Sequence, residues 1–241
     1  MRASSRIGRL AASLAGFLAL GAAEASSAQA GMDAVNPTCP RSPNWSTYRQ
    51  MRFTFEEAGG RRILRAEGMI DEGAPGRLRE ALAANDPVEE IWLRSSGGNA
   101  RAGNEAGRII REAGVPTRIP EGWACFSACN FIFMGGPIRY VDGGGHFIVH
   151  MFTHAQDKAA IRASLAAGED QAIGLIGAVE QDSALLASED NDFLIRMGVS
   201  RKLLTEVMYR QKAVAEQGED RSTRRCLTAD EVARYNVANA R

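Results

Sequence analysis

The sequence predicts an α/β fold in which parallel strands alternate with helices. Three observations support this class. Stretches of strand character alternate with stretches of helical periodicity between residues 51 and 119. The resulting order of strand, helix, strand, helix, strand suits parallel pairing with right-handed crossovers. Glycine is frequent, at 25 of 241 residues, which is typical of a chain with many tight turns.

The first half of the chain is expected to open with a β-hairpin. Its two strands alternate between apolar and polar side chains on either side of a turn at Gly59 and Gly60. Two helices with apolar residues at helical spacing and two further strands follow. Strands are expected at residues 51–56, 63–67, 88–94 and 115–119, and helices at residues 75–84 and 102–113.

The middle of the chain is expected to hold a turn, a short apolar helix and two strands. Residues 122–136 begin as a turn of small residues and continue as a helix of about two turns, which Pro137 helps to stop. Strands are expected at residues 138–141 and 146–150, around a glycine-rich turn.

The remainder is expected to be largely helical. Residues 159–211 carry an apolar stripe and are interrupted at Gly198, whereas residues 211–225 are polar and are interpreted as a loop. A capping-box pattern at Thr228 and Glu231 indicates a last short helix. The apolar stripe is marked by Ile173, Ile176, Val179 and Leu185.

The first thirty residues have the pattern of a secretory signal peptide. Arginines precede an uncharged stretch at residues 10–23, and A-Q-A at residues 28–30 supplies the small residues of a cleavage site. A membrane anchor is the rival interpretation. However, fourteen residues make about 21 Å of helix, which is short of the roughly 30 Å hydrocarbon core. We therefore expect a signal peptide at residues 1–30 and one domain at 31–241, secreted across the inner membrane to a periplasmic or extracellular location.

Composition excludes several classes of protein. The chain is 45% hydrophobic and 24% charged, which argues against disorder, collagen or a coiled coil as its main structure. Lysine plus arginine number 29, as do aspartate plus glutamate, and no long basic run is present. We therefore expect no nucleic-acid partner.

Export changes the interpretation of the four cysteines, which all follow residue 30. An even number in an oxidising compartment permits two disulfides, and four cysteines allow three pairings that the sequence does not distinguish. A zinc site is disfavoured because no C-x-x-C pair is present. The cysteines are Cys39, Cys125, Cys129 and Cys226.

Three residues together suggest nucleophilic catalysis. Ser127 lies just past a turn of small residues at the start of the apolar helix, where its Oγ can be exposed. His150 ends an apolar strand and can act as a base within reach of a hydroxyl. Gly98 follows another strand, and its N–H can approach a substrate carbonyl because no Cβ obstructs it.

The order of these motifs resembles the proteolytic subunit of the Clp protease, and so the wider Clp protease/crotonase superfamily. The resemblance rests on S-S-G-G at residues 95–98, on G-W-A-C-F-S-A-C at residues 122–129, and on F-I-V-H at residues 147–150. The family has a Ser-Pro-Gly-Gly turn, a Gly-x-Ala-x-Ser segment and a hydrophobic strand ending in His. The serine here is displaced by one position. The similarity spans residues 68–236 and implies a ClpP/crotonase-like spiral of ββα units with C-terminal helices.

The resemblance implies roles for four residues. Ser127 would be the nucleophile and His150 the general base, and the N–H groups of Gly98 and Ala128 would form the oxyanion hole. The position of the family's acid is taken by Arg224, which cannot accept a hydrogen bond from the imidazole.

A carboxylate from the polar loop could replace the missing acid. Asp220 is the candidate third member, with Glu219 beside it, and a Ser–His dyad is the other option. The resemblance also places Cys226 near the site, which suggests a bridge from it to Cys125 or Cys129. The competing pairing uses Cys39.

No metal site and no cofactor are expected. His146, His150 and His154 recur every four residues, but on a strand such residues lie about 13 Å apart, too far to share an ion. Lysine as the base and cysteine as the nucleophile are disfavoured by their sequence context.

We thus expect an exported serine hydrolase, specifically a ClpP-like peptidase that acts on a peptide or protein. The alternative is a catalytically inactive binding or scaffold protein of the same fold, which Arg224 at the acid position favours. Acyl-thioester chemistry of the crotonase type is the third option. It is disfavoured because export separates the protein from the pool of coenzyme A. After signal removal no membrane span is expected, and assembly as a homo-oligomer is open.

Overall fold

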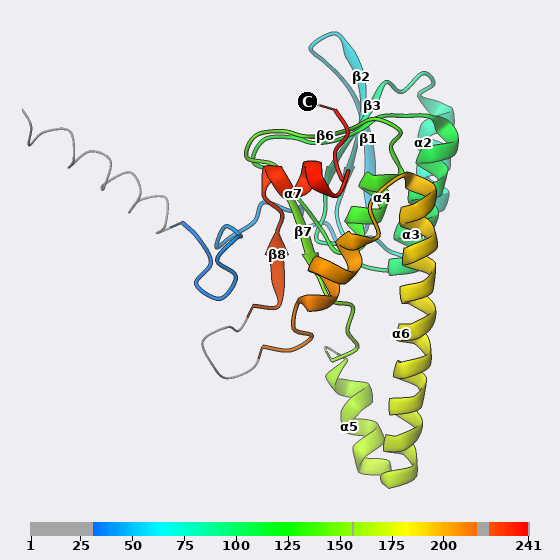
Figure 1. The fold of residues 1–241 in the computed structure, drawn as a ribbon. Helices are drawn as coiled ribbons and strands as arrows, with labels where there is room; N and C mark the ends of the chain where they lie inside the picture. The colour runs from blue at the N-terminus through cyan, green and yellow to red at the C-terminus, as the bar shows by residue number, and fades with distance from the viewer. Residues whose placement is uncertain (1–30, 156, 216–221, 241) are drawn as a thin grey trace, which may run out of the picture. The chain divides into compact units, whose positions relative to one another are not determined.

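Two β-sheets with surrounding helices make up the part of the chain that the computed structural model describes, residues 31–155, 157–215 and 222–240 (Figure 1). Asp33–Arg241 group into one compact unit. The larger sheet runs in the order β1-β2-β3-β4-β6, formed by β1 (Arg52–Ala58), β2 (Arg61–Glu67), β3 (Glu90–Arg94), β4 (Thr117–Ile119) and β6 (Arg139–Val141). The smaller runs β5-β7-β8, formed by β5 (Ala124–Phe126), β7 (His146–His150) and β8 (Arg224–Cys226).

The chain winds through repeated units of two strands and a helix. β4 joins the larger sheet and β5 the smaller one before the next helix begins, and β6 and β7 repeat this step. In the earlier units, isolated β-bridges stand in place of the second strand of the unit. One bridge pairs Ile70 with Gly98, and the other pairs Ser95 with Cys125. The helices that close the units are α2 (Ala74–Ala84), α3 (Ala100–Ala113), α4 (Cys129–Gly135) and α5 (Lys158–Ala167). The predicted α/β class and its ββα spiral are confirmed.

The predicted hairpin and parallel pairing are also present. β1 and β2 pair antiparallel around Gly59 and Gly60, whose φ angles of 60° and 75° explain why glycine occupies this turn. Parallel pairing joins β2 to β3, β3 to β4 and β4 to β6. In a parallel sheet the carboxyl ends of all strands meet at one edge, which is where a site is usually built.

Two short strands differ from the sequence-based expectation. Residues 124–126 were expected to form a turn but make β5, which pairs parallel with β7. Residues 224–226 were expected in a loop but make β8, which pairs antiparallel with β7 and brings Arg224 opposite His150. Both strands are three residues long and depend on pairing with β7, so their sequences carry little periodicity of their own.

The C-terminal helices extend beyond the sheets (Figure 1). α5 and the long α6 (Glu169–Met197) are separated at Gly168, and α6 ends at Gly198 in a left-handed conformation, as the predicted break requires. A π-helix η1 (Leu203–Val207), a 3-10 helix η2 (Met208–Arg210) and the short α7 (Ala229–Arg234) follow. The predicted capping box of α7 is present.

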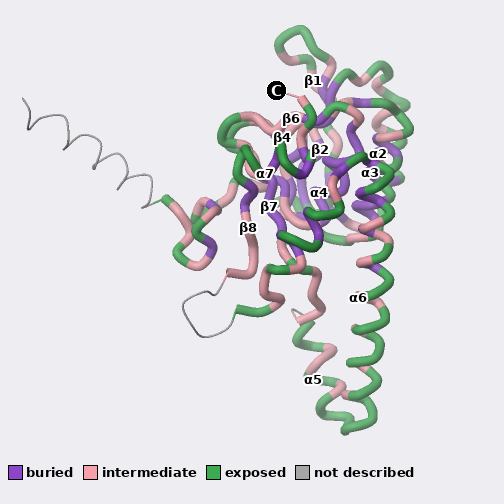
Figure 2. The backbone as a smooth tube through the Cα atoms, viewed as in Figure 1, coloured by how far each residue is buried: buried purple, intermediate pink, exposed green. Residues whose placement is uncertain are grey.

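The predicted apolar stripe of α6 is not buried in this chain. Ile173 and Ile176 are each 58% exposed and Leu185 is 51% exposed, and α5 contributes no buried residue. Figure 2 shows α5 and the adjoining half of α6 as mostly exposed, whereas the half of α6 near α3 is partly buried. No helix in the described ranges is long and apolar enough to cross a membrane.

Candidate active site

Ser127 occupies a strained turn between β5 and α4. Its φ angle is 58°, a left-handed value that non-glycine residues adopt infrequently and that often marks a functional site. The backbone N–H of Ser127 donates to the carbonyl of Ile148 on β7, at 3.3 Å. A sharp turn from strand to helix lifts a side chain off the sheet edge, as in the nucleophile turn of many hydrolases.

The structure brings Ser127 and His150 together. β5 and β7 run parallel, with Phe126 opposite Ile148, so both strands end at the same edge of the small sheet. His150 is the last residue of β7, and its Nε2 lies 2.6 Å from Ser127 Oγ. With the proton on the other ring nitrogen, Nε2 accepts the hydrogen bond from the serine hydroxyl.

The surroundings of His150 keep its ring neutral. Burial lowers the pKa of His150, and a backbone hydrogen bond to Met151 acts in the opposite direction. The Phe126 ring lies against the imidazole, with ring centroids 4.7 Å apart. A neutral imidazole at neutral pH is the form that can take a proton from a hydroxyl.

Gly98, which is predicted to contribute to an oxyanion hole, has a backbone conformation and a close contact that leave no room for a side chain. Its φ of 144° is closed to other residues, and an added Cβ would come within 2.1 Å of the Ile70 carbonyl oxygen. Ile70 forms hydrogen bonds with the two residues that flank Gly98. Its N–H donates to the Gly97 carbonyl, and its carbonyl accepts from the Asn99 N–H. No acceptor for the N–H of Gly98 or of Ala128 is found among the described residues.

Gly97 is a residue that the sequence-based analysis missed. A Cβ at this position would lie 2.7 Å from Ser127 Cβ and 3.2 Å from the Ala128 nitrogen, so the glycine turn and the serine turn are in direct contact. The Gly97 N–H donates to Ser95 Oγ, which donates to the Gly68 carbonyl. This buried serine anchors the glycine turn. The available signal was the first glycine of the Gly97-Gly98 pair, which was interpreted only as part of a turn.

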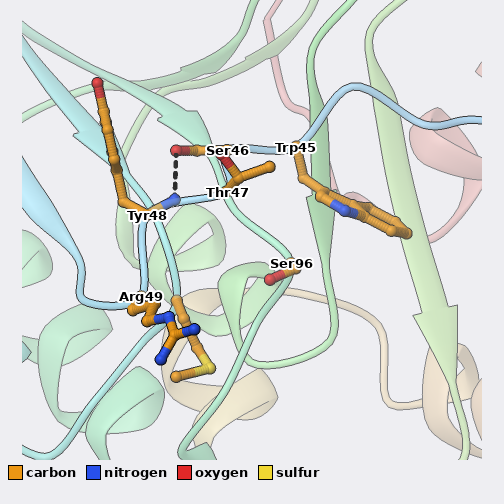
Figure 3. A pocket seen from close by; sticks show the side chains of 7 residues that line it. Trp45, Ser46, Thr47, Tyr48, Arg49 and Ser96 are labelled. Carbon is orange, nitrogen blue, oxygen red and sulfur yellow. Dashed lines mark hydrogen bonds between the residues drawn. The ribbon is translucent and has the colours of Figure 1, made fainter.

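A hollow of about 200 Å³ opens next to the glycine turn (Figure 3). Ser96, which precedes Gly97, faces the segment of residues 45–49 across it. Ser46 Oγ accepts a hydrogen bond from the Tyr48 N–H at 3.4 Å and steadies that segment.

The position expected for a third catalytic residue holds an ion pair. Arg224 is cross-strand from His150, and its guanidinium donates to Asp33 Oδ2 at 2.7 Å. Burial opposes ionisation of Asp33, but hydrogen bonds from Asn36, Val35 and Arg224 lower its pKa to about 2. Asp220 and Glu219 lie outside the described residues. Within the described ranges no carboxylate hydrogen-bonds to His150.

The disulfide pairing corrects one expectation. Cys125 bonds to Cys129 and Cys39 bonds to Cys226, so the suggested bridge from Cys226 to the serine segment is wrong and the competing pairing with Cys39 is present. The first bridge brackets Ser127. The second ties the N-terminal segment to β8. All four cysteines are buried.

The three histidines do not share one strand, because His146 and His150 lie on β7 and His154 lies beyond its end. His154 Nε2 contacts Asp182 Oδ2 at 3.1 Å, whereas His150 contacts Ser127. Within the described part of the chain, no three His, Cys, Asp or Glu side chains are grouped closely enough to hold a metal ion.

Comparison with known proteins finds similarity in fold. The chain matches no family model and no curated protein sequence. Among solved structures it is similar to ClpP1 from Listeria monocytogenes, with 15% identity, 74% of this chain and 89% of that chain covered, and a TM-score of 0.49. It is also similar to a mutant of the 1510-N membrane-bound stomatin-specific protease, with 15% identity, 74% and 76% covered, and a TM-score of 0.44. The roles proposed below rest on the geometry of this chain.

Proposed function

We propose that the protein is an exported serine hydrolase, specifically a ClpP-like peptidase, with Ser127 as nucleophile and His150 as general base. The observation that carries the proposal is the 2.6 Å separation of Ser127 Oγ and His150 Nε2 at a serine with a φ of 58°. A serine held in a strained turn against a half-buried, neutral imidazole is what nucleophilic activation needs.

The reaction follows from these positions. His150 Nε2 takes the proton of Ser127 Oγ while Oγ bonds to the substrate carbonyl carbon, whose oxygen becomes negative. The N–H groups of Gly98 and Ala128 then donate to that oxygen. The C–N bond breaks as His150 returns the proton to the leaving amine. Water repeats the cycle, with its proton passing to His150, and releases the acid and free Ser127.

The base works as part of a dyad in this proposal. Phe126 packs against the imidazole, and the hydrogen bond to the Met151 backbone orients it, so a backbone group does what a carboxylate does in a triad. A backbone carbonyl stabilises the imidazolium less than a carboxylate does. We therefore expect slower turnover than a full triad would support.

Export is part of the proposal. The first thirty residues have the signal-peptide pattern, and two buried disulfides are compatible with an oxidising compartment.

The test is labelling of the purified, oxidised protein with a fluorophosphonate probe. Wild type should be labelled, and Ser127→Ala and His150→Ala should both lose the label. Ser200→Ala and His154→Ala are matched controls, because neither residue contacts the Ser127–His150 pair, and both should label at the wild-type rate.

A second function has one specific observation in its favour. Arg224 and Asp33 fill the region where an acid would be expected, which suits a binding protein that kept the fold without the chemistry. A folded wild-type protein that takes no label would favour this alternative and overturn the hydrolase.

A further inference from the structure

A second cavity lies immediately beyond His150. It has a volume of about 240 Å³, smaller than the pockets that hold drug-sized ligands and suited to a single side chain. Two of its lining residues directly follow His150 in the chain, four come from α6 and one from η2. The lining residues are Met151, Phe152, Ser183, Leu186, Ala187, Asp190 and Tyr209.

Asp190 is a carboxylate with an incomplete set of hydrogen bonds. It is 5% exposed, and its Oδ1 accepts from Asn104 Nδ2 at 3.1 Å. No donor to its Oδ2 is found in the described part of the chain. Burial raises the pKa of Asp190 to about 6, the Asn104 hydrogen bond lowers it and nearby Glu189 raises it, so the carboxyl is ionised at neutral pH. A buried carboxylate is costly unless a donor or cation meets it.

Tyr209 adds a second unsatisfied group to the same cavity. Its hydroxyl is buried, and no hydrogen-bond partner for it is found among the residues that the structure describes. Burial, with a smaller contribution from Asp190, raises the pKa of Tyr209 to about 12, so the phenol stays neutral. Its oxygen can accept a hydrogen bond from an incoming ligand while its proton remains available to Asp190.

Apart from Ser183, the rest of the cavity lining is apolar. Met151, Phe152, Leu186 and Ala187 supply apolar surface, and none of the seven lining residues is basic. A mostly apolar cavity that also holds a carboxylate and a phenol suits an extended alkyl chain with a cationic end. Lysine and arginine side chains have that form.

We propose that this cavity is a specificity pocket that receives the lysine or arginine side chain of a substrate residue next to the bond that is cut. This inference rests on the proposed function, because it is adjacency to His150 that makes the cavity a substrate subsite. The cation pairs with Asp190 Oδ2 and donates to Tyr209 Oη, while its alkyl stem lies against Met151 and Leu186. Both polar groups then gain the partners they lack.

Equilibrium binding tests the pocket without any chemistry. The inactive Ser127→Ala protein is titrated with N-acetyl-lysine methylamide and with N-acetyl-norleucine methylamide, and binding is followed by NMR shifts. The norleucine compound has a similar alkyl stem without the charge. Lysine should bind about tenfold or more tightly, because a charge-assisted hydrogen bond in a buried site discriminates by at least that factor.

Two variants assign the preference to its residues. Asp190→Asn, built on Ser127→Ala, should bind the two compounds about equally, and Tyr209→Phe should lose several-fold of the preference. Tyr209→Phe deletes a hydroxyl that has no partner, so it should fold even where Asp190→Asn does not. Equal binding of lysine and norleucine by the parent protein, an unchanged preference in folded Asp190→Asn, or an undiminished preference in Tyr209→Phe overturns the pocket.

Labelling separates this inference from the proposed function. Wild type should react faster with a lysine-like phosphonate than with an uncharged alkyl fluorophosphonate, whereas Asp190→Asn should show no such preference between the two probes. Alkyl labelling without a lysine preference overturns the pocket and leaves the hydrolase in place. A binding preference for lysine without any labelling overturns the hydrolase and leaves a cation-binding cavity.

Discussion

The two disulfides hold chain segments of very different length. Cys125 and Cys129 are 4 residues apart, whereas Cys39 and Cys226 are 187 apart. In the chain-entropy account, the long loop stabilises the fold by about 5 kcal/mol and the short one by about 2 kcal/mol. The short bridge encloses only Phe126, Ser127 and Ala128. The difference suggests that the long bridge serves stability and the short one serves local geometry.

The surroundings of each bridge support that division. The long one belongs to a small apolar cluster with Ala124 and Ile148, and Trp45 packs on Phe126 beside it with ring centroids 5.6 Å apart. Arg224 and Asp33 join the same two segments by an ion pair. The short bridge instead joins the end of β5 to the start of α4 across the strained Ser127.

The largest expected effect is on stability. Cys39→Ala with Cys226→Ala should lower the free energy of unfolding by about 5 kcal/mol, because it releases the longest covalent loop. Urea unfolding of the oxidised proteins measures this change. The rate of fluorophosphonate labelling, taken where the variant is still folded, should stay within a few-fold of wild type. A large loss of labelling in the folded variant would contradict the idea that the long bridge contributes to stability and not to the geometry of the site.

The reciprocal variant should act mainly on reactivity. Cys125→Ala with Cys129→Ala should slow labelling of Ser127 by about 100-fold, because a displacement of about 1 Å at a reacting group costs that much. Its free energy of unfolding should fall by less than that of the Cys39 and Cys226 pair. The second-order labelling rate and the urea midpoint, measured on the same samples, decide the matter. Unchanged labelling would show that the turn at Ser127 keeps its geometry without the short bridge.

A smaller effect is expected from the ion pair beside the long bridge. Asp33→Asn should cost about 1–2 kcal/mol of the free energy of unfolding at pH 7. The native pKa of Asp33 is lowered from 3.8 to about 2, so the ionised form is the one the fold favours. Its contribution is complete above pH 3.8 and is lost as the pH falls toward 2. Urea unfolding at pH 7, 4 and 3 should show the gap between variant and wild type narrowing at pH 3, and a gap that stays constant would contradict the lowered pKa of Asp33.

The smallest effect is a shift in the pH profile of labelling. The base must be neutral, and burial lowers the pKa of His150, so labelling should rise with pH to a midpoint below 6.5 and then level off. Phe126 lies inside the short bridge and covers the imidazole. Phe126→Ala should let water in and move the midpoint up toward 6.5. A midpoint that is above 6.5 in wild type would contradict the neutral, buried imidazole.

Local patterns were enough to predict the alternating strands and helices and to single out Ser127, His150 and Gly98, whereas Ala128 came only from the family resemblance. Each of these signals lies within a run of about ten residues, where periodicity and turn chemistry act. Ser127 and His150 do lie within hydrogen-bond distance, and their catalytic roles stay a proposal.

The features that were missed depend on distant parts of the chain. β8 exists because β7 pairs with it, and Arg224 is neutralised by Asp33, 191 residues away. The partner of Cys226 depends on where residues 33–49 run, for which the sequence has no periodic signal. Asp190 has no local signal in the sequence, and only the fold places it beside the residues that follow His150.

The spacing of the cysteines also bears on how the bonds can form as the chain emerges from its N-terminus. Cys39 appears first and must wait for a partner 187 residues later, whereas Cys129 follows Cys125 almost at once. Once the local pair closes, only one of the three pairings of four thiols remains, and it is the one in the structure. Early formation of the Cys125–Cys129 bond thus prevents Cys39 and Cys226 from pairing with either of those two cysteines.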